Sequence, residues 1–534
     1  MTPLLKVCDL SVRFGQTVAV DGVTFDLARG AALGIVGESG SGKSVTCRAL
    51  MRLLPPATNI SGSVEFEGRD LLNLSEPELN TIRGKRIAMI FQSPASHLDP
   101  LMRIGEQVAE ALVEHTDLKG RAVWEEVLRL LDVVRIPDPD RCARAYPHQL
   151  SGGMKQRAMI AGALACQPDL LLADEPTTAL DATVQKSVLD LLAQLRREQN
   201  LSMIFVSHDL GAVARVCDDL LVMRRAKLVE RGPVTRVIDA PQHEYTKQLI
   251  ASHPDRLASR QVAAVSQGAP LLEAQGIQIR YGGKSLADVL TGREGGFVAV
   301  KHADFVVRPG ETLGIVGESG SGKTTLARSL VGLVKPHKGE VLFDGAPADP
   351  SGRGRVAYLR DVQLIYQHPY EALSPRLTVQ AAIAEPLRRH RLCPAAEVLR
   401  RVAELMAQVD LAPDLAKRLP GQLSGGQCQR VAIARALAFN PRVLIADEVT
   451  SALDVTLQAQ VMDLLLKLQK ERGLTMVFIS HDLAVIRRLC NSVIVMRAGE
   501  IVEAGPTASV FDAPQQAYTR ALIDAIPHLH GDAA

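Results

Sequence analysis

One octapeptide occurs twice in this chain and constrains the fold more than any other feature: Gly-Glu-Ser-Gly-Ser-Gly-Lys followed by Ser or Thr. Each copy follows a short apolar run, residues 33–36 and 313–316, which predicts a buried strand. Each precedes a stretch, residues 45–54 and 325–334, that predicts a helix. A strand, a glycine-rich turn and a helix in this order are typical of a loop that binds phosphate.

The glycines of the octapeptide allow a sharp turn, so that backbone N–H groups and the positive end of the helix dipole can face an anion. The lysine can reach terminal phosphates, and the last hydroxyl, of Ser44 or Thr324, can bind magnesium. The alternative, a glycine-rich turn with a surface lysine, is disfavoured because both copies stand in the same context. The predicted nucleotide-binding residues are Gly37, Glu38, Ser39, Gly40, Ser41, Gly42, Lys43, Ser44, Gly317, Glu318, Ser319, Gly320, Ser321, Gly322, Lys323 and Thr324.

Further motifs repeat downstream at one constant offset. They are Leu-Ser-Gly-Gly, Ala-Asp-Glu, Ser-His-Asp and a tail motif, Tyr-Thr-Lys or Tyr-Thr-Arg. A constant offset means that no net insertion separates these landmarks, so the sequence predicts one duplicated domain. We predict a first domain at 1–256, a linker at 257–270 and a second domain at 271–534, with an inserted loop at 282–296.

Strands and helices are expected to alternate within each copy. In the first copy, residues 5–12 and 18–27 predict an antiparallel β patch, 169–173 and 202–206 predict buried strands, and 102–134 and 182–197 predict helices. Such alternation favours an α/β fold with a parallel sheet covered on both faces.

Composition excludes several classes of protein. The 534 residues are 47% hydrophobic and 22% charged with a net charge of +2, which is globular and gives no sign of a nucleic-acid-binding surface. No apolar run approaches the length of a membrane span, and no secretory signal is expected at the N-terminus. The eight cysteines form no Cys-x-x-Cys pair and are predicted to be reduced, buried residues.

Two carboxylates end a predicted strand in each copy: Asp174 with Glu175, and Asp447 with Glu448. Beside a phosphate-binding loop, the aspartate can hold magnesium through water, and the glutamate can accept a proton from an attacking water. The alternative is a pair of surface acids at the end of a strand.

His208 and His481 each follow a predicted buried strand, so they are expected at the ligand edge of the sheet. A single histidine in such a place is commonly a structural hydrogen-bonding residue. Because Ser-His-Asp repeats at a fixed distance after both acidic pairs, we favour a phosphate-sensing role in catalysis.

Together these motifs resemble the ATP-binding cassette (ABC) ATPases over nearly the whole chain, twice. Leu-Ser-Gly-Gly is the discriminating motif, because other ATPases with this phosphate-binding loop lack it. The resemblance implies two tandem P-loop ABC ATPase domains, each with a RecA-like parallel sheet core, an antiparallel β subdomain and a helical subdomain. The serine of Leu-Ser-Gly-Gly can cap a following helix whose N-terminus faces an anion. The matching residues are Ser151, Gly152, Gly153, Ser424, Gly425 and Gly426.

The resemblance also implies roles for individual residues. Gln92 and Gln367 match the glutamine loop, which contacts magnesium and the transporter subunit. Asp181 and Asp454 match the aspartate loop at the dimer interface. Phe14 and Tyr281 resemble the aromatic residue that stacks on adenine, although core packing is an equal alternative for an aromatic residue on a β segment.

In this family, two cassettes clamp ATP head to tail. The resemblance therefore implies that Lys43 shares a nucleotide with the signature at 424–426, and Lys323 shares one with the signature at 151–153. Both cassettes lie on one chain, so the pairing is expected within one molecule. Neither copy lacks a motif residue, and both sites are expected to hydrolyse ATP.

The segments 98–107 and 373–379 and the tails 241–246 and 514–519 resemble ATPases of oligopeptide, dipeptide and nickel importers. This resemblance implies two transmembrane permease subunits, an external solute-binding protein acting indirectly, and a peripheral location on the cytoplasmic face of a bacterial plasma membrane. Peptides, including glutathione, are the expected cargo. No iron–sulfur cluster is expected, because the tails after Cys217 and Cys490 carry no cysteine. These segments could instead mark only a general coupling surface, because fold does not fix the substrate.

A soluble twin-cassette protein of translation or DNA repair is the main alternative. The short, near-neutral linker, the absence of cysteine clusters and the lack of a basic stripe disfavour it. An exporter would usually carry fused membrane helices, and the sequence contains no run long enough for one.

Overall fold

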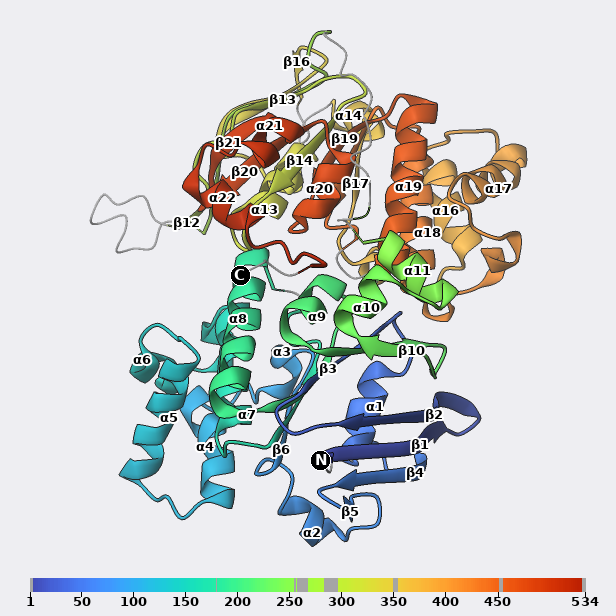
Figure 1. Ribbon diagram of the computed structural model, residues 1–534. Coiled ribbons are helices and arrows are strands. Elements are labelled where there is room, and N and C mark those ends of the chain that lie inside the picture. Colours follow the sequence, from blue (N-terminus) through green and yellow to red (C-terminus); the bar gives the residue numbers. More distant parts are fainter. Residues whose placement is uncertain are drawn as a thin grey trace. The chain divides into compact units, whose positions relative to one another are not determined.

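The computed structural model describes residues 3–178, 180–253, 256, 268–282, 296–348, 354–450 and 455–530. The chain forms two compact units (Figure 1), which we call the first unit, Met1–Arg256 with Pro527–Ala534, and the second unit, Leu257–Ile526. The domain limits given from the sequence stay a prediction. Most of the predicted linker and of the predicted loop at 282–296 lies outside the described residues.

A six-stranded sheet forms the core of the first unit, in the order β10-β9-β3-β8-β7-β6. All neighbours are parallel except β10, which pairs antiparallel with β9. The central strands are buried along their whole length because helices cover both faces, which matches their continuous apolar sequences. The strands are β3 (Ala32–Gly37), β6 (Ile87–Ile90), β7 (Leu170–Asp174), β8 (Ser202–Val206), β9 (Asp219–Arg224) and β10 (Lys227–Pro233).

A second, antiparallel sheet in the order β2-β1-β4-β5 lies at the start of the first unit. Its long strands alternate between buried and exposed residues, as expected for a sheet with one covered face. The strands are β1 (Leu5–Phe14), β2 (Thr17–Leu27), β4 (Asn59–Phe66) and β5 (Arg69–Asp70).

The helices of the first unit form two groups. One group follows the core strands: α1 (Lys43–Leu50), α8 (Ala182–Gln199), α9 (Leu210–Val216), α10 (Val234–Asp239) and α11 (Glu244–Ala251). The short helix α2 (Glu76–Asn80) follows β5 of the antiparallel sheet. The other group, which lies apart from β1, β2 and β4 in Figure 1, is the helical layer: α3 (Pro94–His97), α4 (Ile104–His115), α5 (Arg121–Val133), α6 (Pro139–Arg144), η1 (Pro147–Gln149) and α7 (Gly152–Leu164).

Three predicted helices differ from the structure. The helix predicted at 325–334 is α13 (Lys323–Leu330), which ends at Leu330, before Gly332 with its positive φ of 66°. The helix predicted at 102–134 is two helices, α4 and α5, because α4 ends before an extended Thr116 and Gly120 adopts a positive φ of 56° before α5. The helix predicted at 45–54 ends at Leu50, since Arg52 is left-handed with φ 51° and two prolines follow at 55–56.

The second unit repeats this plan. Its core sheet has the order β17-β18-β19-β14-β20-β21, and its antiparallel sheet has the order β12-β11-β15-β16, with β13 paired to β11. The strands are β11 (Leu272–Tyr281), β12 (Phe297–Val300), β13 (Phe305–Val307), β14 (Thr312–Val316), β15 (Lys338–Phe343), β16 (Ala346–Pro347), β17 (Val362–Ile365), β18 (Val443–Asp447), β19 (Thr475–Ile479), β20 (Ser492–Arg497) and β21 (Glu500–Pro506).

The helices of the second unit match those of the first in order. They are α13 (Lys323–Leu330), α14 (Arg355–Asp361), α15 (Pro369–Ala372), α16 (Val379–Arg389), η3 (Ala395–Glu397), α17 (Val398–Gln408), η4 (Pro413–Lys417), η5 (Pro420–Gln422), α18 (Gly425–Leu437), α19 (Val455–Arg472), α20 (Leu483–Leu489), α21 (Thr507–Asp512) and α22 (Ala517–Ile523). The predicted α/β fold, with a parallel core, an antiparallel patch and a helical layer in each copy, is thus confirmed. Within the described ranges, no helix combines the length and apolar character needed to cross a membrane.

Candidate functional site

The glycine-rich loop of each unit connects the carboxyl end of a central strand to a helix, β3 to α1 and β14 to α13. A Cβ atom on Gly37 would lie 2.1 Å from the Met223 carbonyl oxygen, and one on Gly317 would lie 2.1 Å from the Met496 carbonyl oxygen. No residue other than glycine fits so close to a neighbouring strand. The loop therefore packs closely against β9 in the first unit and against β20 in the second.

The lysine of each loop folds back onto the loop itself. Lys43 Nζ donates to the carbonyl oxygens of Gly37 at 2.7 Å and Glu38 at 2.9 Å, and Lys323 Nζ makes the equivalent bonds at 2.8 Å each. Both lysines are buried at 5% and 4% exposure. A buried ammonium group at the start of a helix gives the loop the positive charge that a phosphate requires.

The hydroxyl that follows each lysine donates to the aspartate at the end of the neighbouring strand. Ser44 Oγ lies 2.7 Å from Asp174 Oδ1, and Thr324 Oγ1 lies 3.1 Å from Asp447 Oδ1. Asp174 is 0% exposed and Asp447 is 3% exposed, which rules out the reading of these aspartates as surface acids.

This hydroxyl–carboxylate pair fits a divalent cation. Burial raises the pKa of Asp174 in spite of the hydrogen bond from Ser44, so the ionised carboxylate is costly without a positive neighbour. Its second oxygen, Oδ2, is buried without a hydrogen-bond partner among the described residues. Magnesium binds such a carboxylate oxygen together with a neighbouring hydroxyl, either directly or through a bound water.

The glutamate after each aspartate sits in strained backbone. Glu175 has a φ of 47° and Glu448 a φ of 49°, values that non-glycine residues rarely adopt and that cluster at functional sites. Gln92 Nε2 donates to Glu175 Oε2 at 2.8 Å, and Gln367 Nε2 donates to Glu448 Oε2 at 2.6 Å. The structure thus brings the predicted glutamine and glutamate of each unit together.

The histidine of each unit faces the same glutamate. His208 Nδ1 lies 3.6 Å from Glu175 Oε2, and His481 Nδ1 lies 3.6 Å from Glu448 Oε2. Burial raises the pKa of Glu175, but the hydrogen bond and charge of His208, with smaller contributions from Thr178 and Lys43, bring it down to about 2. The Glu175 carboxylate therefore stays ionised at neutral pH. The same contact outweighs the effect of burial on His208 and raises the pKa of its imidazole.

The Leu-Ser-Gly-Gly motif of each unit begins a helix of the helical layer. Ser151 Oγ accepts from Met154 N at 3.3 Å at the start of α7, and Ser424 Oγ accepts from Gln427 N at 3.3 Å at the start of α18. These are the predicted helix caps. Each serine is exposed, so the start of each helix is open to solvent.

The remaining predicted residues lie in different environments. Asp181 caps α8, accepting from Val184 N at 3.0 Å, whereas Asp454 lies outside the described residues. Phe14 and Tyr281 end β1 and β11 and are 37% and 41% exposed. Neither ring is buried in the core, and their stacking on adenine stays a prediction.

The sequence reasoning missed a tyrosine in each unit. Tyr245 Oη accepts a hydrogen bond from Glu38 N at 2.9 Å, and Tyr518 Oη accepts one from Glu318 N at 3.1 Å. The repeated tail motif contained this signal, because the tyrosine stands at the same place in both copies. No sequence pattern, however, says that a residue two hundred positions away contacts the loop.

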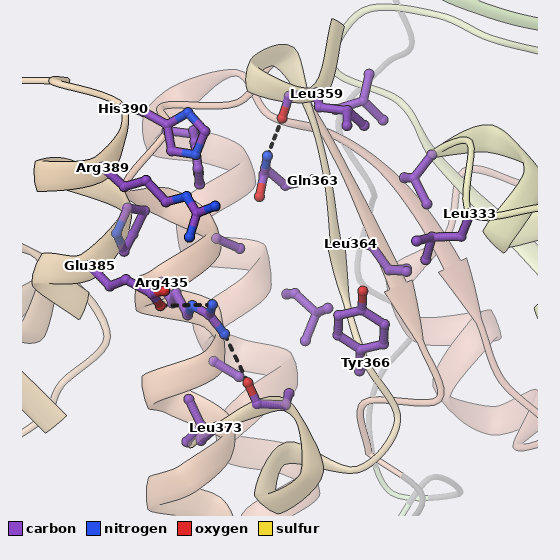
Figure 2. Close-up of a pocket in the computed structure, with 18 of the residues that line it drawn as sticks. Leu333, Leu359, Gln363, Leu364, Tyr366, Leu373, Glu385, Arg389, His390 and Arg435 are labelled. Atoms are coloured by element: carbon purple, nitrogen blue, oxygen red, sulfur yellow. Dashed lines mark hydrogen bonds and ion pairs between the residues drawn. The ribbon is translucent and has the colours of Figure 1, made fainter. Parts of the chain in front are cut away.

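A groove of about 390 Å³ opens in the second unit between β17 and helices α16 and α18, and Tyr366, the residue before Gln367, lines it. Figure 2 shows Arg389, His390, Glu385 and Arg435 on one side of this groove and Leu359, Gln363, Leu364 and Tyr366 on the other. Arg435 is paired to Glu385 at 3.0 Å, whereas Arg389 has no ion pair within the described residues. We call this the β17–α16 groove.

Comparison with known proteins gave consistent matches. The family described as ABC transporter matches residues 20–178 and 300–451, and the one described as oligopeptide/dipeptide transporter, C-terminal region, matches residues 229–277 and 502–534. The chain is 45% identical to "Glutathione import ATP-binding protein GsiA" of Pectobacterium atrosepticum and 44% identical to that of Escherichia coli K12, each over 98% of this chain and 89% of the relative.

Among solved structures, cbiO1 from Clostridium perfringens, part of the ABC transporter complex cbiONQ, is 29% identical over 46% of this chain and 92% of that chain, with a TM-score of 0.41. A dimeric ATP-binding cassette in a post-hydrolysis state with ADP and Pi is 28% identical over 43% of this chain and 98% of that chain, with a TM-score of 0.40.

Proposed function

This chain belongs to the ABC transporter family, and we propose that it is the ATP-hydrolysing subunit of a bacterial importer of peptides, with glutathione-like peptides as the first candidates. The observation that carries this proposal is the match of the oligopeptide/dipeptide transporter C-terminal region in both halves, beside full-length similarity to glutathione import ATP-binding proteins. A soluble twin-cassette protein of translation or repair would not need that region.

Each unit is proposed to bind one ATP at its glycine-rich loop. Lys43 and Lys323 would turn from the loop carbonyls to the terminal phosphates, and the loop N–H groups would face the phosphate oxygens. Magnesium, when bound, neutralises phosphate charge. Ser44 with Asp174, and Thr324 with Asp447, are proposed to hold it, together with Gln92 and Gln367.

Glu175 and Glu448 are proposed as the general bases that take a proton from the attacking water. The low pKa of Glu175 keeps its carboxylate ionised, and the contacts of Gln92 and His208 fix its direction. The histidines can sense the terminal phosphate because each shares the glutamate that faces the water.

The two units are proposed to pair head to tail around nucleotide, with domain limits of 1–256 and 271–534. Ser151, Gly152 and Gly153 would then serve the nucleotide at Lys323, and the signature at 424–426 would serve the one at Lys43. The exposed, capped starts of α7 and α18 support this, because each helix N-terminus is free to face an anion.

An import ATP-binding subunit works with transmembrane permeases. We propose two permease subunits, contacting the surfaces around Gln92 and Gln367, and an external solute-binding protein that acts through them. The chain would lie peripherally on the cytoplasmic face of the bacterial plasma membrane, as its similarity to import ATP-binding proteins supports.

Reconstitution tests the proposal. The chain, two permeases and the binding protein encoded beside it would be placed in proteoliposomes with ATP and magnesium. We expect glutathione or a short peptide to stimulate ATP hydrolysis and to cross the bilayer only with ATP. Association with ribosomes or DNA, and no copurifying permease, would favour the soluble alternative.

A further inference from the structure

A tyrosine near the C-terminal end of each unit contacts the backbone of the phosphate-binding loop. The hydroxyl oxygen of Tyr245 accepts a hydrogen bond from the N–H of Glu38, and that of Tyr518 accepts one from the N–H of Glu318. The same bond forms twice in one chain. The repetition indicates that this hydrogen bond is a property of the fold shared by both units, and not of one local environment.

The peptide group of Glu38 is held on both sides. Its N–H donates a hydrogen bond to Tyr245, and its carbonyl oxygen accepts one from Lys43 Nζ at 2.9 Å. When Lys43 turns to a phosphate, the carbonyl loses this contact. The tyrosine bond involves the N–H and does not depend on the lysine, so it can hold the loop while the lysine moves.

Tyr245 itself is fixed in place. It is 1% exposed, and the guanidinium of Arg224 lies over its ring at 4.7 Å from the centroid. Tyr518 is only partly buried, but Arg497 lies over its ring in the same way, at 4.8 Å from the centroid. Each arginine ends the strand, β9 or β20, against which the glycine-rich loop packs.

A carboxylate anchors the segment that carries each tyrosine. Glu230 on β10 accepts from the backbone N–H groups of Gln242 at 2.7 Å and His243 at 2.9 Å, just before α11. Glu503 on β21 makes the equivalent bonds to Gln515 and Gln516, at 2.8 and 3.1 Å. A continuous set of bonds therefore runs from the edge strand through the C-terminal segment to the loop.

We propose that Tyr245 and Tyr518 are positioning residues that hold each phosphate-binding loop in the shape that receives nucleotide. The C-terminal segment of each unit thereby acts as a brace for its own nucleotide site. Both tyrosines and both anchoring glutamates lie in the regions that match the oligopeptide/dipeptide transporter C-terminal region. The inference rests on the proposed ATPase function, because it requires nucleotide at these loops.

Removing only the hydroxyl tests the brace. Tyr245→Phe, Tyr518→Phe and the double variant would be made in the full-length chain. The KM for ATP, kcat and the affinity for trinitrophenyl-ATP would be measured. Loss of one hydrogen bond to the loop should raise KM and weaken trinitrophenyl-ATP binding at that site by about threefold to tenfold, with kcat nearly unchanged. The double variant should show the change at both sites.

Tyr358→Phe is the matched control. Its buried hydroxyl donates to the Leu330 carbonyl oxygen, at the end of α13 opposite to the loop. This variant should lower the melting temperature without changing KM. If the double variant behaves in the same way, the tyrosines are merely structural and the brace is refuted. If the parent chain hydrolyses no ATP, the proposed function fails, and trinitrophenyl-ATP binding still decides the brace.

Discussion

At the scale of single residues, the motifs predicted which side chains meet, but not the backbone that makes them meet. Strand, turn and helix signals were enough to place Lys43, Ser44 and Asp174 at one sheet edge. The left-handed backbone of Glu175 had no sequence signal, because glutamate disfavours that conformation and only the fold around it imposes it. The bond from Glu38 to Tyr245 depends on tertiary packing, so it too was missed.

Replacing the general base should separate binding from hydrolysis. Glu175→Gln keeps the shape of the side chain and its contact with Gln92 but cannot take a proton. We expect each single variant, Glu175→Gln or Glu448→Gln, to lose at least half of the ATPase activity. The double variant should lose about a hundredfold or more, with ATP binding retained. Phosphate release and nucleotide binding would be measured in parallel.

Lys43→Ala is the comparison for that experiment, because it should abolish binding at the first site rather than hydrolysis alone. Full ATPase activity in either glutamine variant would contradict the assignment of the base.

Removing the buried carboxylate should weaken the response to magnesium. Asp174→Asn and Asp447→Asn keep an oxygen beside Ser44 or Thr324 but lose the negative charge that favours a cation. The magnesium concentration for half-maximal activity should rise about tenfold to a hundredfold. A magnesium titration of ATPase activity checks this. An unchanged midpoint, with reduced kcat, would place these aspartates outside the metal site.

At the scale of secondary structure elements, buried apolar runs were the safest signal. Strand β8 lies where it was predicted, at 202–206, because helices cover both faces of the sheet and every residue of the strand after Ser202 is apolar and buried. The sequence did not predict the boundary between α4 and α5, because the segment between them carries only one glycine. Its short polar stretch resembles the exposed face of a helix. Helix ends depend on a few backbone angles that periodicity does not report.

The repeated Ser-His-Asp motif shows an element-level role that the sequence reasoning did not assign. Asp209 caps α9, accepting from Gly211 N at 2.8 Å and Ala212 N at 3.3 Å, and Asp482 caps α20 in the same way. The aspartate thus fixes the start of the helix that directly follows His208 or His481.

Asp209→Ala should lower the free energy of unfolding of the first unit by about 2 kcal/mol, because it removes both the helix cap and the hydrogen bond that Asp209 Oδ2 accepts from Gln185 Nε2 at 3.0 Å. Asp190→Ala is the matched control, because Asp190 only forms a partly exposed ion pair with Arg215, worth about 0–1 kcal/mol. Thermal and urea unfolding of both variants would be compared. Equal or larger destabilisation by the Asp190 variant would argue against the cap.

At the scale of the whole molecule, the duplication conserves the nucleotide sites but not the surfaces beside them. Helix α4 of the first unit ends in Glu-Ala-Leu-Val-Glu-His, whereas α16 of the second unit ends in Glu-Pro-Leu-Arg-Arg. In α4, Glu110 and Glu114 are exposed without an ion pair among the described residues. In α16, Arg435 neutralises Glu385 while Arg389 is exposed and unpaired. The exposed, unpaired charges at the equivalent ends of α4 and α16 are therefore of opposite sign among the described residues.

Because the charges beside the two nucleotide sites differ in sign, we predict that the two units bind different permease segments. The segment at the β17–α16 groove should be acidic. Arg389→Glu should reduce copurification of the permeases from solubilised membranes about tenfold, with a weaker dependence on salt, because an attractive charge becomes repulsive. Arg400→Glu reverses an exposed charge on α17, outside the groove, and should leave copurification unchanged. Glu114→Arg should disturb only the other permease. If Arg389→Glu and Arg400→Glu behave alike, charge at this groove does not select the partner, and shape alone must distinguish the two units.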